Sequence, residues 1–94
     1  MSLKLANKVL VVIGGTTGLG FSAAKAFVKA GAKVVVVGRN PESAAQAETT
    51  LGKCAKALVG DASHPKTAVL AISAAAKKFG GFHGLYHVAG GSGR

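Results

Sequence analysis

A glycine-rich segment between an apolar run and an amphipathic stretch is the part of this 94-residue sequence best suited to chemistry. The apolar run 9–13 is β-branched on both faces, which predicts a buried strand. Gly14, Gly18 and Gly20 follow it, and glycine lets the backbone turn sharply and approach a ligand closely. From position 19 the apolar residues have helical spacing, with a stripe made of Leu19, Ala23, Ala26, Phe27 and Ala30. Because the start of a helix offers free N–H groups and a partial positive charge, this segment predicts a phosphate-binding turn.

Two other interpretations of the glycine spacing are a P-loop and a turn with a purely structural role. Gly15 and Gly20 have the gap of a P-loop, but Phe21-Ser22 follows them where a P-loop has Lys and then Ser or Thr. The lysine that reaches the terminal phosphates is therefore missing, and a P-loop is excluded. A tight turn that only packs a helix on a sheet remains an alternative for the glycines taken alone.

Strands and helices alternate along the rest of the chain. The expected elements are a strand within 32–37, a helix from Pro41 to about Leu51, a strand at 57–60, a helix from Pro65 to about Lys78, and a strand at 84–88. The expected buried faces are Ala44, Ala47 and Leu51 in the second helix, and Val69, Ile72, Ala76 and Phe79 in the third. Strands that are apolar on both faces, with short connections, predict an α/β fold: one partial, doubly wound parallel sheet over residues 1–94, in the order 3-2-1-4, truncated after its fourth strand.

The composition limits the classes of partner. The chain has 12 Lys and Arg residues against three acidic ones, a net charge of +9, but its lysines are spread along the sequence without interleaved aromatics. We therefore expect them on solvated helix faces and do not expect a nucleic-acid partner. No apolar run reaches the roughly 18 residues of a membrane span, and the first residues lack a signal-peptide pattern, so the expected location is cytoplasmic. The single Cys54 and three scattered histidines predict no metal site.

The order of these motifs resembles the short-chain dehydrogenase/reductase family. The resemblance covers nearly the whole chain and rests on Gly14-x-x-x-Gly18-Leu19-Gly20, on Arg39 after the second strand, on Asp61 after the third and on Ala89-Gly90 after the fourth. It implies a Rossmann-like fold that binds a nicotinamide dinucleotide. The residues that it implies for cofactor binding are Gly14, Thr16, Thr17, Gly18, Leu19, Gly20, Arg39, Asn40, Asp61, Ala62, Ala89 and Gly90.

The resemblance also implies a choice of cofactor. Gly38 stands where members that use NAD often carry an acidic residue for the ribose 2′-hydroxyl, and Arg39 follows it as in many members that use NADP. A guanidinium pairs with a 2′-phosphate in a bidentate way, so NADP is expected rather than NAD. Asn40 is expected to add a hydrogen bond. The alternative for Arg39 is an exposed cation in a turn.

The sequence departs from the family pattern at two motifs and lacks the family's catalytic groups. Ile13 replaces the usual Thr, and His87-Val88 replaces two asparagines, with His87 expected to pack at a strand end. The family's chemistry implies a Ser and a Tyr-x-x-x-Lys, but the only tyrosine is Tyr86 and Gly90 lies four residues after it. We assign no catalytic residue and expect this chain alone to be inactive.

Two functions remain open at this point. The first is the NAD(P)-binding part of an oxidoreductase that transfers hydride between NADP(H) and an alcohol or carbonyl in the complete parent enzyme. The second is a catalytically inactive, truncated Rossmann module that acts by nucleotide binding or self-association. A homo-oligomer is expected, because a sheet that ends at its fourth strand exposes an apolar edge.

Overall fold

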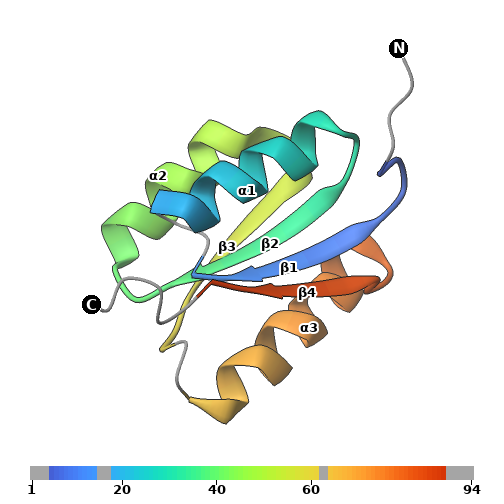
Figure 1. The fold of residues 1–94 in the computed structure, drawn as a ribbon. Coiled ribbons are helices and arrows are strands. Elements are labelled where there is room, and N and C mark those ends of the chain that lie inside the picture. The colour runs from blue at the N-terminus through green and yellow to red at the C-terminus, as the bar shows by residue number, and fades with distance from the viewer. Residues whose placement is uncertain (1–4, 15–17, 62–63, 89–94) are drawn as a thin grey trace.

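A four-stranded parallel sheet with helices on both faces forms the protein (Figure 1). The computed structural model describes residues 5–14, 18–61 and 64–88. The strands are β1 (Val9–Ile13), β2 (Lys33–Gly38), β3 (Ala55–Val59) and β4 (Gly84–His87). The helices are α1 (Gly18–Lys29), α2 (Pro41–Leu51) and α3 (Pro65–Phe79), and a 3₁₀ turn, η1 (Gly52–Cys54), leads from α2 into β3. None of these helices is both long and apolar enough to cross a membrane.

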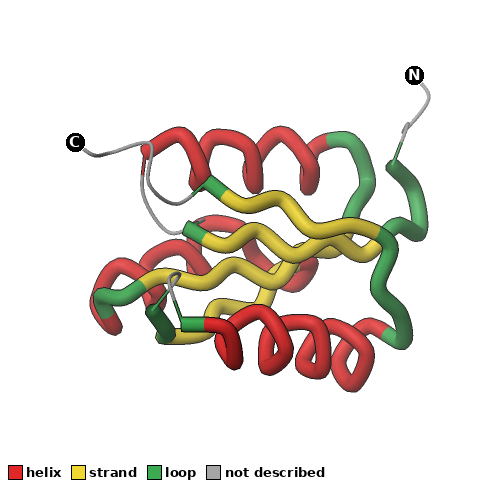
Figure 2. Tube along the Cα trace, turned by 60° about the horizontal axis from the view of Figure 1, so that its bottom comes forward, coloured by secondary structure: helices red, strands yellow, loops and turns green. Residues whose placement is uncertain are grey.

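The strand order is β3-β2-β1-β4, which confirms the predicted order 3-2-1-4. All pairs are parallel, and Val11 in the centre of β1 is level with Val35 of β2 and Leu85 of β4. Helices α1 and α2 cover one face of the sheet and α3 covers the other (Figures 1 and 2). The direction of winding therefore reverses between β1 and β4, as in a doubly wound fold.

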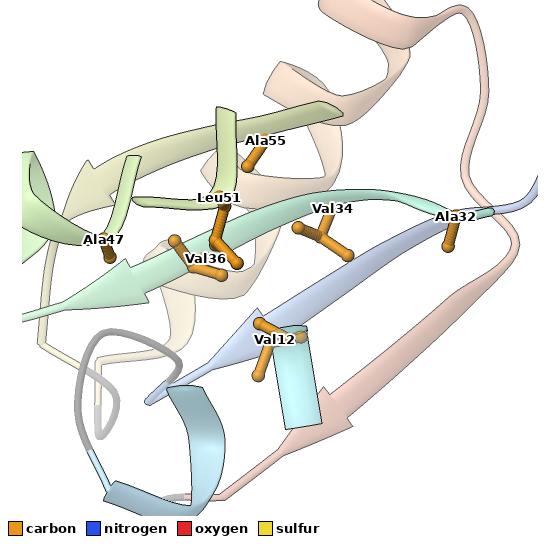
Figure 3. Close-up of a cluster of buried hydrophobic side chains, with 8 residues drawn as sticks. Val12, Ala32, Val34, Val36, Ala47, Leu51 and Ala55 are labelled. Atoms are coloured by element: carbon orange, nitrogen blue, oxygen red, sulfur yellow. The ribbon is translucent and has the colours of Figure 1, made fainter. Parts of the chain in front are cut away.

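Alternate residues of β1 and β2 feed two separate apolar clusters. On the side of α1 and α2, Val12, Val34 and Val36 gather with Ala47 and Leu51 (Figure 3). On the side of α3, the cluster contains Val9, Val11, Ile13, Val35, Val37, Ala71 and Ala75. Both faces of β1 and β2 are therefore buried, which explains why the sequences of these two strands are apolar almost without interruption.

Turn chemistry predicted the element ends well. Helix α2 begins at Pro41 and is followed by Gly52, as expected, and its buried residues are the predicted Ala44, Ala47 and Leu51. Strand β3 begins at Ala55, two residues before the predicted start, because Ala55 already pairs with Val34 of β2.

The predicted buried faces of α1 and α3 were partly wrong. Leu19 is 81% exposed and Ala26 is exposed, whereas Gly20 and Ala24 are the buried residues of α1. The buried residues of α3 are Thr67, Ala71 and Ala75, with Ile72 and Phe79 half-buried as predicted; Val69 and Ala76 point to solvent. An alanine-rich helix has several possible apolar stripes, and the one with the smallest side chains lies closest to the sheet.

Strand β4 is an edge of the sheet within the described residues, and its side chains are correspondingly open. Leu85 is 46% exposed and Tyr86 48% exposed, which agrees with the expected apolar edge. The Tyr86 ring packs edge-on against Phe27 of α1, with centroids 5.6 Å apart. Val69 and Leu70 of α3 add two further exposed apolar side chains.

The corrected face of α3 gives a stability prediction with an adjacent control. Ala75 is fully buried between α3 and the sheet, so Ala75→Leu should lower the free energy of unfolding by about 1–3 kcal/mol through overpacking. Ala76 is exposed, so Ala76→Leu should change it by less than about 0.5 kcal/mol. Urea unfolding followed by circular dichroism measures both, and a larger loss for Ala76→Leu would contradict the described face.

Candidate functional site

The carboxyl ends of the four strands are level along one side of the sheet, which we call the carboxyl edge (Figure 1). Three backbone hydrogen bonds extend the ladders past the strand ends: Gly14 N–H to Val37 O at 2.8 Å, Gly60 N–H to Gly38 O at 2.9 Å, and Val88 N–H to Ile13 O at 2.9 Å. The turns that follow β1, β2 and β3 therefore start side by side. In doubly wound sheets this edge is where ligands bind.

Gly14 and Gly18 flank the connection between β1 and α1. Gly14 and Gly18 have φ of 87° and 59°, the left-handed region that side chains disfavour. A Cβ built on Gly18 would meet nothing within 4 Å, so the space beside the start of α1 is open. The first turn of α1 contains no acidic residue that would neutralise the helix dipole. The positive end of the α1 dipole is therefore not neutralised by a carboxylate in this first turn.

The turn between β2 and α2 places a cation and a helix cap at the same edge. Arg39 follows the buried Gly38 and is exposed. The Asn40 side chain caps α2, because its Oδ1 accepts hydrogen bonds from the backbone N–H groups of Glu42 at 2.8 Å and Ser43 at 3.2 Å. Because Oδ1 accepts these two bonds, the Asn40 side chain can donate to a ligand only through its amide N–H₂ group. The cap fixes where the β2–α2 turn ends and so positions Arg39.

The end of β3 packs tightly against α3. A Cβ on Gly60 would lie 3.1 Å from Thr67 Cγ2 and 3.5 Å from Val37 Cγ1, so glycine allows this close approach. Asp61 follows and is exposed at the carboxyl edge.

The carboxyl edge thus gathers the described members of the predicted site: Gly14, Gly18, Leu19, Gly20, Arg39, Asn40 and Asp61. The other five predicted positions lie outside the described residues: Thr16, Thr17, Ala62, Ala89 and Gly90.

The three histidines have different structural roles, which the sequence predicted only in part. His64 caps α3, its Nδ1 accepting the Lys66 N–H at 3.2 Å. His83 precedes β4 and binds Val9 twice: its N–H donates to Val9 O at 2.8 Å and its Nδ1 accepts the Val9 N–H at 2.9 Å. Histidine is not a common helix cap, so the sequence carried little signal for the first role. His87 is exposed at the end of β4 rather than packed, because the described part of β4 has a neighbour on one side only.

A metal centre finds no support among the described side chains. Nowhere in residues 5–14, 18–61 and 64–88 do three His, Cys, Asp or Glu residues lie close enough to hold an ion. The carboxyl edge combines backbone N–H groups at helix starts and the Arg39 guanidinium, groups that suit phosphate, with the carboxylates of Glu42 and Asp61.

A doubly wound parallel sheet, with a glycine turn leading into the first helix at the edge where the winding reverses, defines a Rossmann-like protein. The comparison with family models identifies the family. Residues 8–94 match the model of the short chain dehydrogenases, and the chain belongs to that family.

Two curated relatives illustrate the range of similarity. Momilactone A synthase of Oryza sativa subsp. japonica is 36% identical over 91 residues, which cover 96% of this chain and 33% of that protein. The NADP-dependent (R)-specific alcohol dehydrogenase of Lentilactobacillus kefiri is 42% identical over 52 residues, which cover 55% of this chain and 21% of that enzyme.

Solved structures show the same fold. The 3-ketoacyl-(acyl-carrier-protein) reductase of Brucella melitensis, complexed with NADH, superimposes with a TM-score of 0.81 at 36% identity, over 87% of this chain and 34% of that one. A short chain dehydrogenase of Bacillus anthracis gives a TM-score of 0.79 at 28% identity, over 88% of this chain and 35% of that one. The chain thus spans about a third of the length of relatives that match nearly all of it.

Proposed function

We propose that residues 1–94 form the NADP(H)-binding portion of a short-chain dehydrogenase/reductase-type oxidoreductase. The parent reaction is hydride exchange between NADP(H) and an alcohol or carbonyl group. The observation that carries the proposal is that Arg39 and the glycine turn before α1 lie at one edge, at the ends of paired strands. A positive side chain and a helix start are thereby placed where one dinucleotide can reach both.

The glycine turn is the proposed seat of the pyrophosphate. The left-handed Gly14 and Gly18, and the open space beside Gly18, let backbone N–H groups approach phosphate oxygens. Thr16 and Thr17 are proposed to add contacts from the same turn, and Leu19, 81% exposed, to border it. Further along the edge, Asp61 and Ala62 are proposed for the adenine, and Ala89 and Gly90 for its ribose.

The preference for NADP rests on the end of β2. The strand ends at Gly38, where an acidic side chain would repel a 2′-phosphate, and the exposed Arg39 offers two parallel N–H donors to it. Asn40 holds the turn with Oδ1 and is proposed to add its amide N–H₂ as a donor. The relatives' names do not decide between the cofactors: one is an NADP-dependent enzyme and one was solved with NADH.

Catalysis by this chain alone is not part of the proposal. The family's Tyr-x-x-x-Lys does not occur in the 94 residues. Tyr86 is no substitute, because its ring packs against Phe27 of α1 and Gly90 stands where the motif needs a lysine. We therefore propose cofactor binding without turnover.

The first prediction separates NADPH from NADH. A hydrogen-bonded charge pair contributes about 1.5–3 kcal/mol, so Arg39→Leu should weaken NADPH binding about 10- to 100-fold and leave NADH binding within about twofold. Lys25→Leu, which removes an exposed cation from the middle of α1, is the control and should change neither. Titrations of both cofactors by fluorescence measure this. Tighter binding of NADH by the unchanged chain would overturn the NADP assignment.

The second prediction tests the glycine turn with a matched backbone change. Gly18 and Gly80 both have positive φ, 59° and 82°, and at neither would a Cβ meet an atom within 4 Å. Gly18→Ala and Gly80→Ala should therefore each destabilise the fold by about 1–2 kcal/mol. Gly18→Ala alone should weaken binding of both cofactors, because Gly80 lies at the far end of α3. Equal binding by the two folded variants, measured by titration, would contradict the proposed pyrophosphate seat.

A second candidate function, self-association, is favoured by the edge strand β4. Its outer backbone groups and the 46%-exposed Leu85 can pair with another copy of the chain. Light scattering should then give about twice the 9.3 kDa monomer mass, and Leu85→Lys should return it to the monomer. Leu70→Lys on the exposed face of α3 is the control and should leave the dimer intact. A monodisperse monomer for the unchanged chain would exclude this function.

A further inference from the structure

Lysines that are far apart in the sequence come together at the edge of the sheet opposite the proposed cofactor site. The strands begin at this edge, and α1 and α3 end there, at the right of Figure 1. Lys8 and Lys33 are joined by a backbone hydrogen bond of 2.9 Å between adjacent strands. We call the following six residues the lysine edge: Lys8, Lys29, Lys33, Lys53, Lys77 and Lys78.

Acidic residues are few near the lysine edge. The whole sequence has three, and all are described. Glu42 is in the first turn of α2 and Asp61 follows β3, which places both at the carboxyl edge. Glu48 begins the last turn of α2, and its Oε1 accepts the Ala57 N–H in the middle of β3 at 3.3 Å. The six lysines of the lysine edge are therefore offset by at most one nearby carboxylate, that of Glu48.

Stabilisation of helix ends explains only half of these lysines. Lys29 ends α1, and Lys77 and Lys78 are in the last turn of α3, where cations favourably meet the negative end of the helix dipole. Lys8 and Lys33 belong to strand starts, and strands have little net dipole. Lys53 is in the short turn η1. Four strands about 4.8 Å apart make this row roughly 14 Å long, the length of about four stacked nucleotides.

We propose that the lysine edge binds single-stranded nucleic acid through its phosphate backbone. Lysine acts as a point charge on phosphate and does not impose the planar geometry with which arginine reads base edges, so the binding is without sequence preference. The loop before β4 adds an aromatic surface, because Phe82 is 37% exposed next to this edge. A base can stack on such a ring while lysines hold the backbone.

The side chains of the lysine edge disfavour two other anionic partners, an acidic protein and an anionic membrane surface. Protein–protein interfaces are depleted of lysine and built around apolar anchors. A membrane surface requires apolar side chains that insert beside the cations. Among the described residues, the one large exposed apolar side chain beside the lysine edge is Phe82, before β4. The exposed aliphatic residues of the described chain lie elsewhere: Leu19 near the start of α1, Val59 at the end of β3, Val69 and Leu70 in the first half of α3, and Leu85 within β4.

The test is fluorescence anisotropy of the chain with labelled oligo(dT) of about 20 nucleotides, longer than single-strand sites of about 4–16 nucleotides. With about four phosphates contacted, the logarithm of affinity should fall against the logarithm of salt with a slope of about −3. The double variant Lys8→Gln, Lys53→Gln should reduce this slope by about 1.4 and weaken binding about 25-fold at 0.1 M salt. Both side chains are exposed, so circular dichroism should report an unchanged fold.

Three controls make the outcome decisive. The double variant Lys25→Gln, Lys66→Gln removes two exposed lysines outside this edge and should leave affinity within about threefold; an equal loss in both double variants would overturn the proposal. Saturating NADPH should not displace the oligonucleotide, and displacement would overturn it by placing the strand at the carboxyl edge. Binding to vesicles of phosphatidylcholine with phosphatidylserine, but not to oligo(dT), would also overturn it. The comparison of lysine variants and the vesicle control do not require NADPH to bind, so failure of the cofactor proposal is separately visible.

Discussion

Burial of the paired strands β1 and β2 on both faces is the constraint on which the rest of the structure depends. Val11, Val12 and Val34 to Val36 have no exposed surface, and each buried valine contributes about 1.5–3 kcal/mol. Strands that are apolar on both faces do not fix their own register, because a slip by one residue within the apolar run neither exposes an apolar face to solvent nor buries a polar one. The ends of the pair must supply that information. The Lys33 N–H donates to Lys8 O where the strands begin, and the Gly14 N–H donates to Val37 O where they finish.

The level ends of the strands give the two edges of the sheet different electrostatic characters. All three helices begin at the carboxyl edge and end at the opposite side of the sheet, where the strands begin. Helix starts carry partial positive charge and helix ends partial negative charge. At the carboxyl edge, Asn40 and His64 satisfy backbone N–H groups of α2 and α3 with their side chains. The first turn of α1 contains no acidic residue, so its partial positive charge is not neutralised there.

The sequence predicted the elements and their order, but not which side of each helix faces the sheet. Gly52 and Pro65 gave reliable ends, since a glycine stop and a proline start depend on local backbone geometry. The faces of α1 and α3 depend on how closely each helix approaches the sheet, which brought Ala24 and Ala75 inward and left Leu19 outside. Local pattern cannot show this, because alanine is apolar on any face. The sequence did not predict that the lysines lie together for a similar reason. The βα connections, not the spacing along the sequence, bring Lys8 and Lys33 side by side.

The two proposed anion-binding edges work by opposite physical means. At the carboxyl edge, backbone N–H groups and the dipole of α1 already favour phosphate, and Arg39 adds discrimination rather than the main attraction. At the lysine edge, the ends of α1 and α3 repel an anion, so their terminal lysines first offset that repulsion. Only the cations beyond them, such as Lys8 and Lys53, produce net attraction. Contacts made by exposed ammonium groups are screened by salt, whereas fixed N–H groups in a turn are screened much less. Rising salt should therefore weaken anion binding at the lysine edge at concentrations that still leave binding at the glycine turn nearly unchanged.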